Sequence, residues 1–164
     1  MSNVLLSVRD LRTWFHTDQG IAKAVAGVSF DVMEGETLGI VGEAGCGKTV
    51  TSLSVLGLLP QPPAEVMESS SILFEGEELV GATEARLRAL RGNEISMIFQ
   101  EPMSALNPSM TCGKQVAEIL EIHTKLADKD IKRKVLQLFE KVELPRALEL
   151  YRSYPHQLGG GQKP

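Results

Sequence analysis

One segment of the sequence combines residue types and a spacing that suit phosphate binding. Residues 42–49 read GEAGCGKT, which fits the pattern G-x-x-x-x-G-K-[ST]. The glycines permit backbone angles and close approaches that a Cβ would prevent. In such a loop the backbone N–H groups surround a phosphate, Lys48 reaches the β- and γ-phosphates, and the Thr49 hydroxyl ligates Mg²⁺. The segment therefore predicts a site for a nucleoside triphosphate.

The residues on either side predict the elements that would position this loop. Residues 37–41 (TLGIV) have the apolar character of a strand, and residues 50–59 that of a helix. A helix in this position directs its positive N-terminal end at the anion. The expected nucleotide-binding set of the loop is Gly42, Glu43, Ala44, Gly45, Cys46, Gly47, Lys48, Thr49 and Val50.

The bulk composition narrows the class of protein. The chain has 164 residues, 43% hydrophobic and 23% charged, which is typical of a soluble globular protein. Its net charge is −4 and no basic tract stands out, which argues against a nucleic-acid partner. The longest apolar stretch, residues 50–59, is half of the roughly 20 residues that a membrane helix needs. We expect a soluble chain whose contact with a membrane goes through a partner.

The pattern of hydrophobic residues changes along the chain and predicts two parts. The first, residues 1–100, should hold strands at 4–8, 14–16 and 24–32, a hairpin over 71–77, a helix over 83–90 and a buried strand over 94–99. The second, residues 101–164, should hold helices near 113–126, 128–142 and 145–151. The boundary falls at Gln100, because a Pro-bracketed loop follows it.

Three segments in order carry a resemblance to a known family: GEAGCGKT, MIFQEPMSALNP at residues 97–108, and YPHQLGGGQ at residues 154–162. Together they resemble the ATP-binding subunit of an ATP-binding-cassette (ABC) transporter, in particular the peptide/nickel importer group. The resemblance covers nearly the whole chain. It implies an α/β fold: a P-loop NTPase core with an N-terminal antiparallel β subdomain in residues 1–100, then a Q-loop and an α-helical subdomain in residues 101–164 that runs up to the signature motif.

The resemblance also implies roles for single residues. Lys48 and Gln100 would be catalytic, and Gln100 would join Thr49 in ligating Mg²⁺ while it orients the attacking water. Phe15 occupies the position at which the family stacks an aromatic ring on adenine. Trp14 is the competing candidate, because adjacent strand residues face opposite sides and one of the two should meet the base.

The end of the sequence departs from the family pattern. The signature motif LSGGQ reads LGGGQ here, so that Gly159 replaces the serine that would contact the γ-phosphate on a second subunit. The remaining signature residues expected to bind nucleotide are Gly160, Gly161 and Gln162. The Asp-Glu pair and the switch histidine that follow in the family are absent, and the sequence contains no other Asp-Glu pair. We therefore expect the N-terminal part of a longer subunit, without its Walker B half.

The function implied by the resemblance is ATP binding and hydrolysis, with Mg²⁺, that energises the import of peptides or similar small solutes. Its partners would be transmembrane permease subunits, a second ATP-binding subunit in a head-to-tail dimer and, indirectly, an external solute-binding protein, at the cytoplasmic face of the membrane. The alternative is a non-catalytic fragment that binds nucleotide without hydrolysing it. A GTPase or a small-molecule kinase is disfavoured, because no N-K-x-D segment is present and the helical insert after Gln100 would be unexplained.

Overall fold

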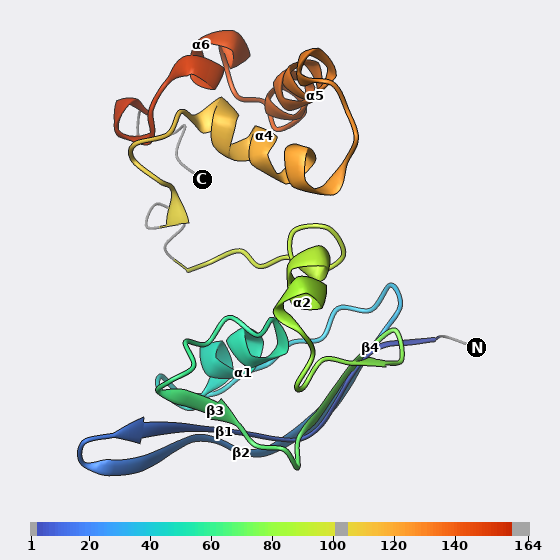
Figure 1. The fold of residues 1–164 in the computed structure, drawn as a ribbon, viewed down its shortest axis with the longest axis vertical. Helices are drawn as coiled ribbons and strands as arrows, with labels where there is room; N and C mark the ends of the chain where they lie inside the picture. The colour runs from blue at the N-terminus through green and yellow to red at the C-terminus, as the bar shows by residue number, and fades with distance from the viewer. Residues whose placement is uncertain (1–2, 101–104, 159–164) are drawn as a thin grey trace. The chain divides into compact units, whose positions relative to one another are not determined.

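The computed structural model describes residues 3–100 and 105–158. The chain forms two compact units, Met1–Arg91 and Gly92–Pro164, and each is described by itself (Figure 1). The first is a sheet with two helices, and the second is helical. The sequence-based division at residues 100 and 101 concerns subdomains of a whole cassette and stays a prediction.

A five-stranded antiparallel sheet forms the framework of the first unit. Its order is β2-β1-β4-β5, and β3 also pairs with β1. The strands are β1 (Val4–Thr17), β2 (Gly20–Met33), β3 (Ala64–Val66), β4 (Ser71–Phe74) and β5 (Glu77–Glu78). Residues 4–8 and 14–16, predicted as separate strands, belong to the single strand β1. The gap between them holds register shifts and Asp10 at φ 44°, where the alternation of side chains is interrupted.

The core of the first unit lies between this sheet and helix α1 (Lys48–Val55), which covers one face of the sheet (Figure 1). Apolar side chains from strands and helices are buried there, among them Val8, Leu11, Val25, Ile72, Val55 and Leu90. The last belongs to α2 (Glu84–Leu90), whose first turn is capped by the Thr83 hydroxyl accepting from the Arg86 N–H. Burial of these side chains, each worth about 1.5–3 kcal/mol, fixes α1 on the sheet.

Two predicted strands are absent from the described structure. Residues 37–41 and 94–99 have no strand assignment, and Val41 and Ile98 are 92% and 93% exposed. A strand requires a neighbour for its N–H and C=O groups, and among the described residues no strand pairs with either segment. Both segments are apolar, as the sequence indicated, but neither forms a strand in this structure, so these two strand predictions are wrong. Conversely, β3 was not predicted, because it follows directly on Pro62 and Pro63.

The second unit is built from α4 (Cys112–His123), α5 (Asp128–Lys141), α6 (Ala147–Arg152) and the 3₁₀ turn η1 (Pro155–Gln157). The three predicted helices are therefore confirmed: α5 begins at Asp128 as predicted, and the other ends are displaced by one to three residues. Val135, Phe139 and Ala117 form the buried centre with residues of α6. Gly113 lets α4 approach Tyr151 so closely that a Cβ would collide with its ring.

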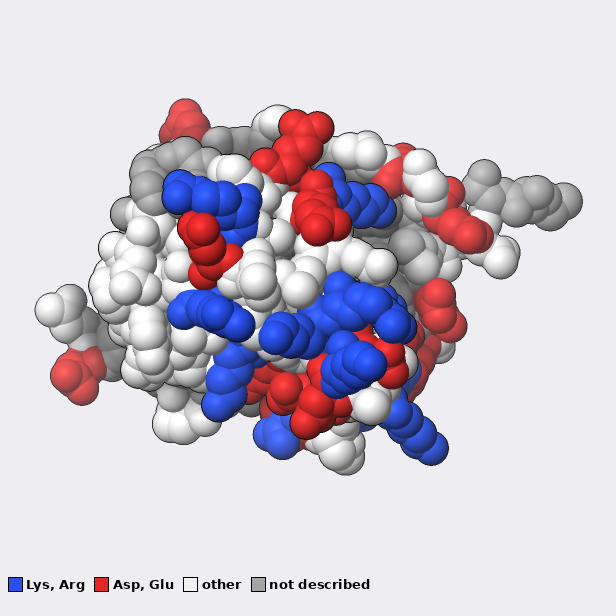
Figure 2. Space-filling model, turned by 90° about the horizontal axis from the view of Figure 1, so that it is seen from above, with Lys and Arg blue, Asp and Glu red and all other residues white. Residues whose placement is uncertain are grey.

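No helix within the described residues is both long and apolar enough to cross a membrane. The face of the molecule in Figure 2 carries Lys and Arg side chains interspersed with Asp and Glu. Among the ion pairs of the described residues, Arg133 pairs with Asp130 on α5 at 2.7 Å. This surface is one of mixed charge.

Candidate phosphate-binding site

The glycine-rich loop leads directly into α1 and has the left-handed backbone that its glycines allow. Gly45 has φ +81° and Gly47 has φ +95°, values that L-residues rarely adopt. Gly47 is the N-cap residue of α1, so the helix begins at Lys48, two residues before the predicted start. The helix ends at Val55 rather than Leu59, because Gly57 at φ +60° turns the chain.

The N-terminal end of α1 presents unpaired donors. The first helical bond runs from the Thr51 N–H to the Gly47 carbonyl at 2.8 Å. The N–H groups of Lys48, Thr49 and Val50 donate to no described residue, as expected in the first turn of a helix. Together with the positive end of the helix dipole, these donors can bind an anion such as a phosphate.

The Lys48 side chain lies across the loop rather than extending into solvent. Its ammonium donates to the carbonyl oxygens of Gly42 at 2.8 Å and Glu43 at 2.7 Å. Its Nζ also lies 3.6 Å from the Cys46 Sγ. Two backbone acceptors thus hold a positive charge at the loop, and no ion pair between Lys48 and a carboxylate is present among the described residues. This arrangement can bind and orient a polyphosphate chain.

The structure shows a separate steric reason why two of these positions require glycine. A Cβ on Gly47 would lie 2.6 Å from the Ala24 carbonyl oxygen on β2, and a Cβ on Gly42 would lie 2.6 Å from the Cys46 Sγ. A Cβ on Gly45 would have no other atom within 4 Å, so the positive φ of Gly45 is the constraint that favours glycine there. The sequence motif suggested the glycines in general terms, whereas the contact with Ala24 comes from a strand that the motif does not include.

The Thr49 hydroxyl is exposed and makes no hydrogen bond to a described residue, in contrast to Thr51, whose hydroxyl donates to the Gly47 carbonyl at 3.0 Å. A hydroxyl oxygen suits a hard cation such as Mg²⁺. The predicted division of roles, with Thr49 for the metal and Lys48 for the phosphates, stays a prediction.

The two aromatic candidates for adenine lie near the end of β1. Phe15 is half-buried and pairs with Ala22 on β2 and Ala64 on β3, two small neighbours. Trp14 pairs with Lys23, whose ammonium lies 4.9 Å from the centroid of the Trp14 ring. This cation covers one face of the indole, and the assignment of the adenine to Phe15 rather than Trp14 stays a prediction.

A buried pair of hydroxyls, which sequence reasoning missed, ties α1 to β1. The Thr13 and Ser54 hydroxyl oxygens are 2.8 Å apart, and both residues are buried. Ser54 also donates to the Val50 carbonyl at 2.8 Å, so Thr13 is the donor in the pair. Polar residues such as Thr13 in strands and serines such as Ser54 in helices are common. The sequence therefore could not reveal that these two side chains meet.

The remaining predicted site residues do not lie in this unit. Gln100 is exposed and belongs to the second unit. Gly159, Gly160, Gly161 and Gln162 lie outside the described residues. The structure therefore brings together residues 42–50 and leaves the proposed roles of the other residues as predictions.

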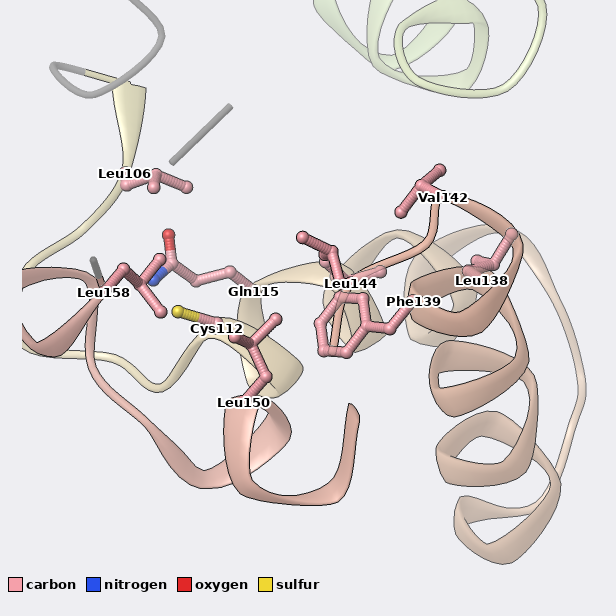
Figure 3. Close-up of a pocket in the computed structure, with 10 residues that line it drawn as sticks. Leu106, Cys112, Gln115, Leu138, Phe139, Val142, Leu144, Leu150 and Leu158 are labelled. Carbon is pink, nitrogen blue, oxygen red and sulfur yellow. The ribbon is translucent and has the colours of Figure 1, made fainter. Parts of the chain in front are cut away.

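The second unit contains an apolar cavity of about 520 Å³, shown in Figure 3. Leucine, valine and phenylalanine side chains from α4, α5, α6 and the segments that flank these helices dominate its lining, and Gln115 and Cys112 contribute the polar atoms. Burial raises the pKa of the Cys112 thiol, which keeps it protonated at neutral pH. With no charged group in its lining, this cavity is unsuited to phosphate.

Comparison with known proteins identifies the family. The family model described as ABC transporter matches residues 25–164. The dipeptide transport ATP-binding protein DppD of Bacillus subtilis is 46% identical over 159 residues, which cover 97% of this chain and 47% of that protein. The oligopeptide transport ATP-binding protein OppD of the same organism is 43% identical, with 97% and 44% covered. The chain thus spans about half the length of these relatives.

Solved structures show the same fold at low sequence identity. The dimeric bacterial ABC transporter cassette MJ0796 superposes with a TM-score of 0.79 at 20% identity, covering 96% of this chain and 64% of that one. The cassette cbiO1 of Clostridium perfringens gives a TM-score of 0.66 at 22% identity, with 98% and 57% covered. The predicted α/β class, an ABC ATPase cassette with an antiparallel β part and a helical part, is confirmed. By its sequence motifs, the family match and its fold, the chain belongs to the ABC transporter family.

Proposed function

We propose that residues 42–50 bind ATP with Mg²⁺. The observation that carries this proposal is the state of the loop and the start of α1: three N–H groups of the first helical turn donate to no described residue, and the Gly42 and Glu43 carbonyls hold the Lys48 ammonium at the loop. The N–H groups would surround the phosphates, Lys48 would contact the β- and γ-phosphates, and Thr49 would ligate the metal. Phe15 would stack on the adenine, and Gln100 would complete the metal site. Mg²⁺ would neutralise part of the triphosphate charge.

The test is calorimetric titration of the chain with ATP and Mg²⁺. Lys48→Ala should weaken ATP binding by about tenfold or more, since it removes charge-assisted hydrogen bonds. Lys23→Ala, a change of the same kind on β2, is the control and should leave the phosphate contribution intact. Lack of ATP affinity in folded wild-type chain, or equal affinities of wild type and Lys48→Ala, would contradict the proposal.

We also propose the role of the whole subunit: ATP hydrolysis that energises an importer of peptides or similar small solutes. The names of the Bacillus relatives, dipeptide and oligopeptide transport ATP-binding proteins, support this substrate class. The partners would be transmembrane permease subunits, a second ATP-binding subunit in a head-to-tail dimer and, indirectly, an external solute-binding protein. The subunit would bind peripherally at the cytoplasmic face of the membrane, and Gly159 to Gln162 would contact the ATP held by the second subunit.

For the chain of 164 residues alone, we propose nucleotide binding without turnover. The family resemblance places the base that activates water in an Asp-Glu pair, and this sequence contains no such pair. Phosphate release and ATP binding should therefore be measured on the same preparation. Binding without release supports the proposal. Release that disappears in Lys48→Ala would show that the chain is an ATPase by itself.

A further inference from the structure

Arg91, the last residue of the first unit, contacts the end of α1 opposite to the phosphate-binding end. Its Nε donates to the Leu56 carbonyl at 2.8 Å, and its Nη2 donates to the Gly57 carbonyl at 2.5 Å. Its Nη1 donates to the Glu84 carboxylate at 3.0 Å. The side chain is 22% exposed. The guanidinium therefore joins the C-terminal end of α1 to helix α2 through three hydrogen bonds.

The end of α1 is built so that these two carbonyls remain available. The Leu58 N–H donates to the Leu53 carbonyl at 2.9 Å, and the Gly57 N–H donates to the Ser54 carbonyl at 3.0 Å. With Gly57 at φ +60°, this is a Schellman motif, which satisfies the carbonyls of the last helical turn. The carbonyls of Leu56 and Gly57, which take no part in these two bonds, accept from Arg91. The positive guanidinium also lies at the negative end of the helix dipole.

Helix α1 connects this end to the phosphate site as a short rigid element. Eight residues span about 12 Å at 1.5 Å per residue, so a tilt at the C-terminal end displaces the N–H groups at the other end. Among the described residues, the polar attachment of α1 to the sheet is the Thr13–Ser54 hydroxyl bond, at the next-to-last residue of the helix. The Arg91 bonds are charged, come from the residue that caps the C-terminal end of α2, and hold the same end of α1 from a second element.

We propose that Arg91 is a positioning residue for the phosphate site and acts through the C-terminal end of α1. The inference rests on the proposed function of residues 42–50. Arg91 touches neither phosphate nor metal. It holds the axis of α1, and thereby the N–H groups of Lys48, Thr49 and Val50, in the orientation that surrounds a phosphate. Its loss should weaken the binding of the phosphate chain and spare the contact of Phe15 with the base.

The experiment compares three probes on the full chain by calorimetry: ATP with Mg²⁺, inorganic triphosphate with Mg²⁺, and adenosine. The variants are Arg91→Ala, Arg91→Lys and the matched control Arg88→Ala. Arg88 is a cation of the same helix α2, is 73% exposed, and lies 3.8 Å from the same Glu84 carboxylate without contacting α1 among the described residues. Arg88→Ala therefore removes the same positive charge as Arg91→Ala but leaves the Arg91 hydrogen bonds to the end of α1 in place.

Arg91→Ala should weaken the binding of ATP and of triphosphate about tenfold, in line with the loss of hydrogen bonds from a charged group. It should change the affinity for adenosine less than about twofold. Arg91→Lys should fall between wild type and Arg91→Ala, because one ammonium reaches one carbonyl well but not both with the guanidinium geometry. Arg88→Ala should match wild type for all three probes. A role in stability alone would not separate triphosphate from adenosine.

An equal loss for triphosphate and adenosine in Arg91→Ala overturns the proposal, and so does an Arg88→Ala variant that behaves like Arg91→Ala. If Arg91→Ala fails to fold, Arg91→Lys decides: unchanged triphosphate affinity in that folded variant overturns the proposal, and a selective loss supports it. Wild-type chain that binds adenosine but not triphosphate would refute the phosphate site itself, and the role of Arg91 with it. Failure of the Arg91 proposal and failure of the phosphate-site proposal therefore give different results.

Discussion

The backbone of Gly47 lies against the backbone of Ala24: a Cβ on Gly47 would come within 2.6 Å of the Ala24 carbonyl oxygen. One residue is the N-cap of α1 and the other belongs to β2. The loop that presents donors to a phosphate is thus pressed directly onto the sheet. A side chain at position 47 would have to move either the strand or the start of the helix.

Gly47→Ala should therefore abolish phosphate binding and lower the free energy of unfolding. The unfavourable φ of +95° costs about 1–3 kcal/mol by itself, and the collision with Ala24 adds to it. Gly45→Ala is the matched control, because Gly45 also has a positive φ of +81° but a Cβ there would have no atom within 4 Å. Urea denaturation and ATP titration should show a smaller loss for Gly45→Ala. Equal losses would mean that the contact with Ala24 contributes nothing.

Removal of the Thr13 hydroxyl should destabilise the first unit. Thr13→Val keeps the shape of the side chain but removes the donor to Ser54, and it should lower the free energy of unfolding by about 1 kcal/mol. The loss stays modest because Ser54 retains its bond to the Val50 carbonyl. Thr13→Ser keeps the hydroxyl and should be affected through its missing methyl group alone. Chemical denaturation measures both variants, and a neutral Thr13→Val would show that the hydroxyl pair is energetically silent.

Removal of the Phe15 ring should weaken ATP binding without affecting inorganic triphosphate. Stacking of a base on an aromatic ring is worth about 1–3 kcal/mol, so Phe15→Ala should cost roughly tenfold to a hundredfold in ATP affinity. Phe15→Tyr keeps a flat ring and should bind nearly as wild type. Trp14→Ala tests the neighbouring ring, one face of which is covered by Lys23. A larger loss in Trp14→Ala than in Phe15→Ala would reverse the assignment.

The Thr49 hydroxyl should make ATP binding dependent on Mg²⁺. Thr49→Val should reduce the gain in ATP affinity on adding Mg²⁺, whereas Thr49→Ser, which keeps the oxygen, should preserve most of it. Titration with ATP in EDTA and in Mg²⁺ gives the two affinities of each variant. An undiminished Mg²⁺ effect in Thr49→Val would exclude Thr49 as a ligand.

Glu78 should contribute acid sensitivity to the β4–β5 hairpin. Burial raises the pKa of Glu78, but hydrogen bonds from the Ser71 hydroxyl and from N–H groups of Val80, Ile72 and Leu79 outweigh it, so the pKa lies below its ordinary value of 4.5. Because the pKa is lower in the folded state, this stabilisation is present above about pH 4.5 and is lost as the pH falls through the folded value.

Glu78→Gln should therefore flatten the fall in melting temperature below pH 4.5, while it lowers the melting temperature at pH 7. Glu75→Gln, at an exposed position of the same hairpin, is the control and should follow the wild-type curve. Thermal unfolding monitored by circular dichroism between pH 3 and 7 would show the difference. Parallel curves for wild type and Glu78→Gln would contradict the assignment.

The residues of the phosphate loop and the helices could be predicted from the sequence because both are encoded locally. The motif at residues 42–49 places its glycines, lysine and threonine within a single turn and the start of α1, and the 3.6-residue period marks α4 and α5 through contacts within each helix. Errors of up to four residues at helix ends arise where single residues decide where the chain turns, as Gly57 does after α1.

The tertiary structure alone decided which partners these elements find. The strands predicted at residues 37–41 and 94–99 did not form, because a strand depends on a neighbour that its own sequence does not specify. The contacts of Gly47 with Ala24, Thr13 with Ser54 and Arg91 with Leu56 join residues 23, 41 and 35 positions apart. Local sequence determines the donors of the phosphate site, and these long-range contacts determine where the donors point.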